Sequence, residues 1–457
     1  METTDKISCN IVVDMLVAHG VTQAVVSPGS RNAPLVMALA RRDEIVKTVV
    51  IDERSAAFIA LGKASISGAP VVLVCTSGTA VLNYAPAVAE AYYRRVPLVV
   101  ISADRPMEWI DQDDSQTLRQ YEALSHYVKR SYDIPAECAT DSLQWYVNRI
   151  MNDALLCAVS GRKAPVHINL QLDNPLDGKS EWPGGRWLDR VVDRLPVECM
   201  MPEDECAKVA SRLASPCRVL IIAGFMEPDP VLNEAVAMLA TRDNIVVMTE
   251  SISNLKSDRF IGNIDATLSV MTEEMKRQLS PDVVITFGGA IVSRFVKQYL
   301  RSMDIGEHWH VGLTDTTIDC FRKLTLKIDM EPAAFFKAIA SVAVPAGTSE
   351  YSARWLSVAS EAAAVHARFL STVPWCDLKA TSYVFGHLPA GCNVQLSNGT
   401  AVRYAQLFDA RGVGRCDCNR GVSGIDGSTS TAIGASSVFE GVTLFITGDM
   451  SAQYDVG

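Results

Sequence analysis

The sequence Ala24-Val25-Val26-Ser27-Pro28-Gly29-Ser30-Arg31-Asn32-Ala33-Pro34-Leu35 runs from a short apolar segment through a turn of small residues into a helical pattern. The same order of apolar run and helical stretch repeats along the first part of the chain. Further apolar runs lie at 48–51, 71–75 and 98–102, and helical stretches lie at 33–42, 55–66 and 81–93. Such alternation predicts a parallel sheet covered by helices on both faces.

Two more sets of strand and helix patterns follow, which indicates three domains. The second set begins at the apolar run 219–223, after a segment at 173–194 whose Pro, Gly and Trp residues are typical of a linker. At ~150 residues per domain, a chain of 457 residues would also contain about three domains. We therefore expect an α/β protein of three doubly wound parallel-sheet domains, with boundaries at 1–185, 195–345 and 350–457.

The third of these domains is short. Its strand candidates are 393–396 and 442–446, and the sequence ends soon after the turn Gly448-Asp449 that follows the second candidate. The carboxyl end of a parallel strand is where α/β proteins bind a diphosphate and its metal ion. We expect the third domain to be incomplete and the sequence to break off inside a ligand site.

The composition is that of a globular protein and argues against some classes of function. Hydrophobic residues make up 48% and charged residues 21% of the chain, and the net charge of -10 disfavours a general role in binding nucleic acid or an anionic membrane. The twelve cysteines form no Cys-x-x-Cys pair, and no apolar run is long enough to span a membrane. We expect a cytoplasmic protein with reduced thiols and small-molecule partners, and with no nucleic-acid or membrane partner.

Polar and glycine residues gather where the expected strands end. Small residues in the turn after the first strand would let backbone N–H groups approach an anion, and Arg31 could bind a carboxylate, although Pro28-Gly29 is also an ordinary turn sequence. Asp52 and Glu53 could face a ligand crevice, or could only favour the N-terminus of the following helix. Four further segments add hydroxyl, glycine and arginine residues: 75–80, 103–106, 397–403 and 419–427. Packing alone explains such a concentration less well than a ligand site does.

Two of these runs carry a specific resemblance. Residues 27–35 and 419–427 resemble signatures of the thiamine-diphosphate enzymes, and among them those of the 2-succinyl-5-enolpyruvyl-6-hydroxy-3-cyclohexene-1-carboxylate synthase family of menaquinone biosynthesis. The resemblance spans all three expected domains. It implies thiamine diphosphate and Mg²⁺ or Mn²⁺ as cofactors, and 2-oxoglutarate and isochorismate as substrates. It also implies a homodimer or homotetramer whose sites combine the first domain of one subunit with the third domain of another.

The resemblance also assigns roles to individual residues. Glu53 matches the catalytic glutamate that hydrogen-bonds the cofactor's aminopyrimidine ring, and Asp449 matches a metal ligand. The implied cofactor contacts are Glu53, Ser77, Gly78, Ser423, Gly424, Ile425, Gly448, Asp449, Met450 and Ser451. The implied substrate contacts are Ser30, Arg31, Arg105, Ser115, Gln116, Arg294, Arg403 and Arg420. Arg294 could equally be a surface arginine. In the implied reaction 2-oxoglutarate loses CO2, and the succinyl carbanion equivalent adds to isochorismate in a 1,4-addition.

The sequence departs from the family pattern at several positions. Gly399 stands where the family usually has a serine, and Ser115 where it usually has an asparagine. The family's second metal ligand, an asparagine, would lie beyond Gly457, so we expect Mg²⁺ to be held poorly and this chain to be weakly active or inactive. Two other readings stay open: another thiamine-diphosphate enzyme, such as an acetolactate synthase or a 2-oxo acid decarboxylase, and a non-catalytic regulator that binds a metabolite.

Overall fold

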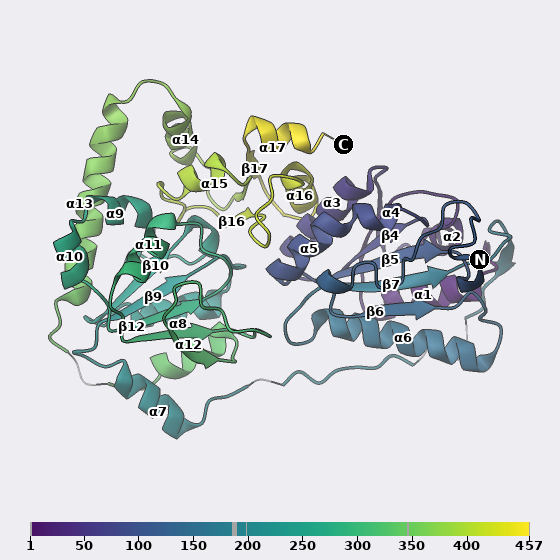
Figure 1. Ribbon diagram of the computed structural model, residues 1–457, viewed down its shortest axis with the longest axis horizontal. Helices are drawn as coiled ribbons and strands as arrows, with labels where there is room; N and C mark the ends of the chain where they lie inside the picture. Colours follow the sequence, from purple (N-terminus) through teal and green to yellow (C-terminus); the bar gives the residue numbers. More distant parts are fainter. Residues whose placement is uncertain (1, 185–189, 198, 345–346, 457) are drawn as a thin grey trace. The chain divides into compact units, whose positions relative to one another are not determined.

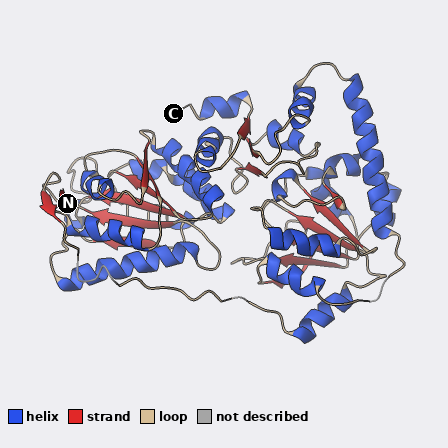
Figure 2. Ribbon diagram, turned by 180° about the vertical axis from the view of Figure 1, so that it is seen from behind, coloured by secondary structure: helices blue, strands red, loops and turns tan. Residues whose placement is uncertain are grey.

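The computed structural model describes residues 2–184, 190–197, 199–344 and 347–456 (Figure 1). The chain divides into two compact units. The first unit comprises Met1–Pro196, Asn419–Thr443 and Asp449–Gly457, and the second comprises Val197–Cys418 and Leu444–Gly448. Each unit contains a six-stranded sheet with helices packed around it (Figure 2). The three domain boundaries expected from the sequence stay a prediction.

The sheet of the first unit has the strand order β3-β2-β4-β5-β7-β6, and all of its neighbouring strands are parallel. Its strands are β2 (Gln23–Val26), β3 (Val46–Val49), β4 (Val71–Cys75), β5 (Leu98–Asp104), β6 (Ser131–Ile134) and β7 (Val166–Gln171). Along β4 the side chains alternate between two cores: Val72 and Val74 belong to one, and Val71 and Leu73 to the other. The predicted parallel sheet, buried on both faces, is therefore confirmed.

Helices cover both faces of this sheet (Figure 1). One core contains residues of α1 (Ile7–Ala18), α2 (Ala33–Ala40) and α6 (Asp141–Val159), and the other contains residues of α3 (Glu53–Ser67), α4 (Ala80–Asn83) and α5 (Ala85–Arg94). The stretch 81–93, expected as one helix, is thus divided between α4 and α5. Pro86 lies in the first turn of α5, where a missing N–H costs nothing, whereas inside a continuous helix it would remove a hydrogen bond.

Two local expectations need correction. The strand expected at 48–51 is β3, which ends at Val49, and Ile51 is 83% exposed in the turn before α3. The segment 173–194, expected to be a linker, contains β8 (Lys179–Glu181), which pairs antiparallel with β1 (Glu2–Thr4). Sequence composition identified turn-forming residues there but not their pairing with the distant N-terminus.

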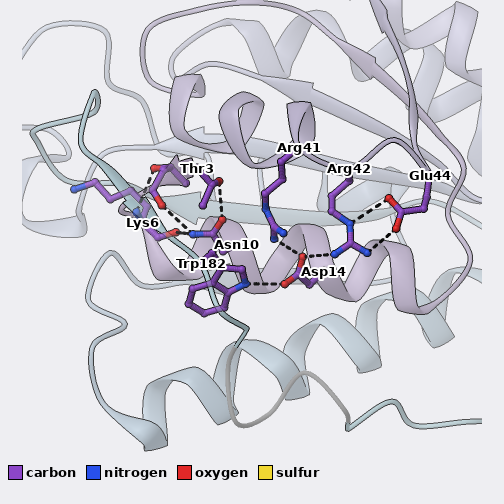
Figure 3. A network of polar contacts seen from close by, with 9 residues as sticks. Thr3, Lys6, Asn10, Asp14, Arg41, Arg42, Glu44 and Trp182 are labelled. Atoms are coloured by element: carbon purple, nitrogen blue, oxygen red, sulfur yellow. Dashed lines mark hydrogen bonds and ion pairs between the residues drawn. The ribbon is translucent and has the colours of Figure 1, made fainter. Parts of the chain in front are cut away.

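A polar network holds part of this segment against α1 (Figure 3). Asp14 on α1 accepts hydrogen bonds from Arg41, from Arg42 at 3.0 Å and from the indole N–H of Trp182 at 2.7 Å. Asp14 is 9% exposed, so its charge needs these partners. Trp182 therefore anchors the segment to the first unit.

The sheet of the second unit has the order β11-β10-β9-β12-β13-β14, again with parallel neighbours. Its strands are β9 (Val219–Ala223), β10 (Ile245–Thr249), β11 (Phe260–Ile261), β12 (Val283–Phe287), β13 (Glu307–Val311) and β14 (Leu324–Ile328). One face packs against α7 (Glu203–Arg212), α8 (Pro230–Leu239) and α12 (Pro332–Ala340). The other face packs against α9 (Ile264–Val270), α10 (Glu273–Gln278), α11 (Arg294–Ser302) and α13 (Tyr351–Thr372).

The two histidines of β13 are packing residues. His308 and His310 are 1% and 4% exposed, and their ring nitrogens lie 2.8 and 3.1 Å from the Thr286 hydroxyl on the neighbouring strand. Burial lowers the pKa of His308 to about 4, so this ring is neutral at pH 7. His308 and His310 alternate along β13, and both contact the Thr286 hydroxyl, so their spacing is explained by packing against β12.

A separate three-stranded sheet has the order β16-β15-β17. Its strands are β15 (Asn393–Leu396), β16 (Arg415–Cys418) and β17 (Thr443–Ile446), with α14 (Asp377–Phe385) and α15 (Thr400–Ala405) nearby in the sequence. By contrast, α16 (Ser428–Ser436) and α17 (Asp449–Tyr454) belong to the first unit. In the described parts of the chain no helix is both long and apolar enough to cross a membrane.

Candidate active site

The turn after β2 is fixed by its own asparagine and by the neighbouring strand. The Asn32 side chain, fully buried, accepts from the Gly29 amide at 2.9 Å and donates to the Ser27 carbonyl at 2.9 Å. The Arg31 amide donates to the Thr76 hydroxyl at 3.2 Å. A Cβ on Gly29 would lie 2.4 Å from the Thr76 Cβ, so glycine is required for this close approach.

Two arginines lie near one another at this edge of the sheet. Arg31 is 6% exposed and donates to the Leu172 carbonyl at 2.8 Å. Arg105 donates to the Asp114 carboxylate at 2.7 Å and to the Ser115 carbonyl at 3.1 Å. Burial lowers the pKa of Arg31, and the positive charge of Arg105 lowers it further. The carboxylates of Asp173, Asp114 and Asp104 act in the opposite direction, so the charge of this arginine pair is partly compensated. A guanidinium group at this edge could bind a carboxylate.

The loop after β5 closes over the turn that follows β4. Gln116 donates from Nε2 to the Ser77 carbonyl at 2.9 Å, and the Gly78 amide donates to Oε1 of Gln120 at 2.6 Å. Ser115 and Gln116 adopt φ angles of 41° and 42°, a left-handed conformation that costs energy for residues other than glycine. The structure therefore brings Arg105, Ser115 and Gln116 together with Ser77 and Gly78, while Ser30 is exposed on the neighbouring turn.

Asp104, directly before Arg105, has a role that the sequence reading did not assign. Its side chain is 2% exposed and accepts from the Asn169 side chain at 3.1 Å and from the Arg105 amide at 2.8 Å. Burial raises the pKa of Asp104 to about 6, although both donors act in the opposite direction. Asn169 also accepts a hydrogen bond from Gln120 at 3.2 Å. Asp104 thus anchors the start of the loop that carries the predicted substrate contacts.

Glu53 is the first residue of α3. The preceding Asp52 caps this helix, since its carboxylate accepts a hydrogen bond from the Ser55 amide at 2.8 Å. For Asp52 this agrees with the alternative that it favours the N-terminus of the following helix. Glu53 is half-buried, and in the part of the chain that the structure describes its carboxylate has no hydrogen-bond donor. Burial raises the pKa of the Cys75 thiol, and the nearby negative charge of Glu53 adds to this effect. Glu53 is therefore placed beside the end of β4 with its carboxylate available to a ligand.

The loop 419–427 packs against α3 and α5. Gly427 has a φ of 70°, and a Cβ there would lie 2.1 Å from the ring of Phe58 on α3. The Ser451 hydroxyl donates to the Ile425 carbonyl at 2.6 Å, which brings two predicted cofactor contacts together. Ser423 has a φ of 69°, and Ile425 is 38% exposed. The glycine spacing in this signature is thus explained in part by close packing on a helix.

A buried glutamate that the sequence did not single out also holds this loop. Glu90 on α5 accepts hydrogen bonds from the amides of Gly421 and Val422. These two residues directly follow Arg420, which is half-buried. The sequence could have pointed to this role of Glu90 only through its position as a charged residue within an otherwise apolar stretch of helix.

The predicted metal ligand lies at the start of α17. Asp449 and Met450 are both exposed, and the amide of Gly448, in the second unit, donates to the Ser397 hydroxyl at 3.2 Å. Within the described ranges, no group of three or more His, Cys, Asp or Glu side chains could hold a metal ion. The role of Asp449 stays a prediction.

Two further predicted substrate arginines belong to the second unit. Arg294 is exposed at the first position of α11, and Arg403 is exposed on α15. The predicted set is therefore divided between the two units.

A cavity of about 510 Å³ lies within the second unit, and its volume alone would suggest a ligand site. Its charged side chains are already engaged: Lys256 donates to the Val413 carbonyl, and Arg411 pairs with Asp409 at 2.6 Å. None of the predicted site residues lines it. The types of side chain present therefore favour the strand-end residues of the first unit over this cavity as the ligand site.

Comparisons with known proteins identify the family of this chain. Residues 9–123 match the family model described as thiamine pyrophosphate enzyme, N-terminal TPP binding domain, and this range contains Arg31, Glu53, Gly78 and Arg105. Proteins named 2-succinyl-5-enolpyruvyl-6-hydroxy-3-cyclohexene-1-carboxylate synthase are similar along nearly the whole chain. The protein of Porphyromonas gingivalis is 40% identical over 99% of this chain and 79% of its own length. That of Bacteroides fragilis is 39% identical over 99% and 80%, and that of Desulfotalea psychrophila 35% identical over 96% and 80%. The chain belongs to the 2-succinyl-5-enolpyruvyl-6-hydroxy-3-cyclohexene-1-carboxylate synthase family, and is thus a thiamine-diphosphate-dependent transferase of menaquinone biosynthesis.

Proposed function

We propose that this protein decarboxylates 2-oxoglutarate and adds the resulting succinyl carbanion equivalent to isochorismate in a 1,4-addition. The observation that carries the proposal is the pair Arg31 and Arg105, two guanidinium groups that lie near one another at the carboxyl edge of the first sheet. Both substrates are dicarboxylates, and a guanidinium group binds a carboxylate through two parallel hydrogen bonds. A monocarboxylate such as pyruvate would make less use of this pair.

The residues present fit the cofactor. The carboxylate of Glu53 has no donor in the described chain, which suits a group that must exchange a proton with the ring nitrogen of an aminopyrimidine. Thiamine diphosphate, when bound, supplies the electron sink that decarboxylation of a 2-oxo acid requires. In this proposal Glu53 holds the proton that is exchanged with that ring.

The remaining contacts complete the proposed site. Ser77, Gly78, Ser423, Gly424 and Ile425 would contact the cofactor, and Gly448, Asp449, Met450 and Ser451 its diphosphate end. Asp449 would bind Mg²⁺ or Mn²⁺ through a carboxylate oxygen, which is a ligand that hard cations prefer. Ser30, Ser115, Gln116, Arg294, Arg403 and Arg420 would contact the substrates. We also propose a homodimer or homotetramer, which sedimentation of the purified protein would test.

The test is the loss of isochorismate absorbance in the presence of thiamine diphosphate, Mg²⁺ and 2-oxoglutarate. We expect isochorismate consumption that depends on all three additions and on Glu53. The matched control replaces 2-oxoglutarate by pyruvate. Consumption of pyruvate without isochorismate would instead favour an acetolactate synthase or a 2-oxo acid decarboxylase. Cofactor or metabolite binding without turnover of either acid would favour a regulator.

A further inference from the structure

The side chain of Glu90 is placed to hold the loop that carries Arg420. It lies on α5, is 3% exposed, and uses both carboxylate oxygens: Oε1 accepts from the Gly421 amide at 2.7 Å and Oε2 from the Val422 amide at 2.6 Å. Hydrogen bonds from N–H groups to a charged acceptor are about twice as strong as neutral ones. The charge of Glu90 is therefore stabilised by two amides of the backbone that follows Arg420.

The same helix also holds the residue before Arg420. Arg94, one helical turn after Glu90, donates to the Asn419 side chain at 3.0 Å, and Asn419 donates in turn to the Thr431 hydroxyl at 3.0 Å. Positions four residues apart lie on one face of a helix, so Glu90 and Arg94 contact the loop together. The backbone is thus fixed on both sides of Arg420.

Glycine at position 421 allows this approach. A Cβ on Gly421 would lie 2.6 Å from the main-chain oxygen of Glu90, so a side chain there would push the loop off the helix. α5 also follows β4 and its Ser77-Gly78 turn through the short helix α4. One continuous segment, 75–94, therefore connects the proposed cofactor turn to the loop around Arg420.

We propose that Glu90 is a positioning residue for Arg420: by holding the two amides after it, Glu90 fixes the direction in which the guanidinium group meets a substrate carboxylate. The inference rests on the proposed function, because it assigns Arg420 to substrate binding. Glu90 itself touches neither substrate nor cofactor. A guanidinium group binds a carboxylate through two hydrogen bonds of fixed direction, so a displaced loop should weaken substrate binding.

The decisive variant is Glu90→Gln, which keeps the shape but offers one acceptor and one NH2 group to two N–H donors. We expect KM for at least one dicarboxylate to rise about tenfold, with kcat changed less than about threefold, as for a lost binding contact. Amide hydrogen exchange at 421–422 should become faster than in the wild type. Glu234→Gln, at an exposed glutamate of α8, is the matched control and should change neither quantity.

A double-mutant cycle shows whether Glu90 acts through Arg420. If it does, Glu90→Gln should add little to the effect of Arg420→Lys, whereas two independent effects would multiply. Unchanged KM in Glu90→Gln, or multiplying effects in the cycle, would overturn the proposal. Should Glu90→Gln fail to fold, Glu90→Asp retains the charge but shortens its reach, and the same two readouts apply.

The failure of this inference is distinct from the failure of the proposed function. If the wild type consumes isochorismate but Glu90→Gln matches it in KM, only the inference is wrong. If the wild type consumes none, the proposed function is wrong, and hydrogen exchange at 421–422 still tests the hold of Glu90 on the loop. Unchanged exchange there would overturn the inference without any activity measurement.

Discussion

Glu250 accepts a hydrogen bond from the amide of Ser293 at 2.7 Å, and its other carboxylate oxygen accepts from Val292 at 2.9 Å. Glu250 follows β10, and Ser293 is the N-cap of α11, so a buried carboxylate occupies the positive end of this helix. The second-unit sheet reverses its strand order between β9 and β12, where α/β proteins commonly bind dinucleotides. There the Gly289 amide donates to the Phe225 carbonyl at 2.7 Å, which joins the two strand ends directly.

The first prediction concerns Glu250. Glu250→Gln should lower the free energy of unfolding by about 1–3 kcal/mol, because a buried N–H would face an NH2 group in place of an acceptor. Urea unfolding at pH 7 measures the change, with the exposed Glu234→Gln as control. A loss no larger than that of the control would mean that the helix end does not depend on this charge.

Because the Glu250 carboxylate already occupies this helix end, we also expect no binding of NAD to the wild type in a calorimetric titration.

The second prediction concerns Glu53. Glu53→Gln should reduce kcat more than 100-fold, since general acid–base groups typically contribute about 10²–10⁴-fold. The affinity for thiamine diphosphate, followed by tryptophan fluorescence, should fall only modestly because the glutamine amide can still hydrogen-bond the ring. Retained turnover would remove Glu53 from its assigned role.

The third prediction concerns the arginine pair. Arg105→Lys should raise KM for 2-oxoglutarate about tenfold, since lysine keeps the charge but loses the two-pronged hydrogen bonding. Arg31→Lys should do the same and also lower stability, because Arg31 is buried and donates to the Leu172 carbonyl. Arg149→Lys, at an exposed position of α6, is the control. Equal KM values in all three variants would contradict a carboxylate site at this edge.

The fourth prediction concerns the pH dependence of stability through Asp104. Its folded pKa of about 6 lies above the ordinary aspartate value of 3.8, so between these values the folded protein binds more protons than the unfolded chain. This contribution to stability is fully present below about pH 4 and is lost as pH rises through about 6. Asp104→Asn should remove it.

Urea unfolding of the wild type and of Asp104→Asn between pH 4 and 7 measures this difference. The free energy of unfolding of the wild type, relative to the variant, should fall by about 2 kcal/mol across that range, a magnitude reduced for partial solvent screening. Parallel curves for the two proteins would show that Asp104 titrates normally. The same measurement on Asp304→Asn, at an exposed aspartate, controls for the substitution.

The sequence alone determined the strands and the family. The runs 71–75, 98–102, 219–223 and 283–287 are strands in the structure, because uninterrupted apolar, β-branched segments of this length are stable only when buried in a sheet. The signature runs 27–35 and 419–427 pointed to the cofactor class through their resemblance to a known family, which the comparisons then confirmed. The stretch 81–93 was expected as one helix, and its division before Pro86 appeared only in the structure.

The tertiary structure alone decided which distant residues support the site. Glu90 and Gly421 are separated by 331 positions, and Glu250 and Ser293 by 43, so no local pattern couples them. In the sequence Glu90 resembles the exposed Glu234, because both are glutamates on helices. Burial distinguishes them: a carboxylate removed from water must find donors, and the fold alone determines which backbone amides lie within reach.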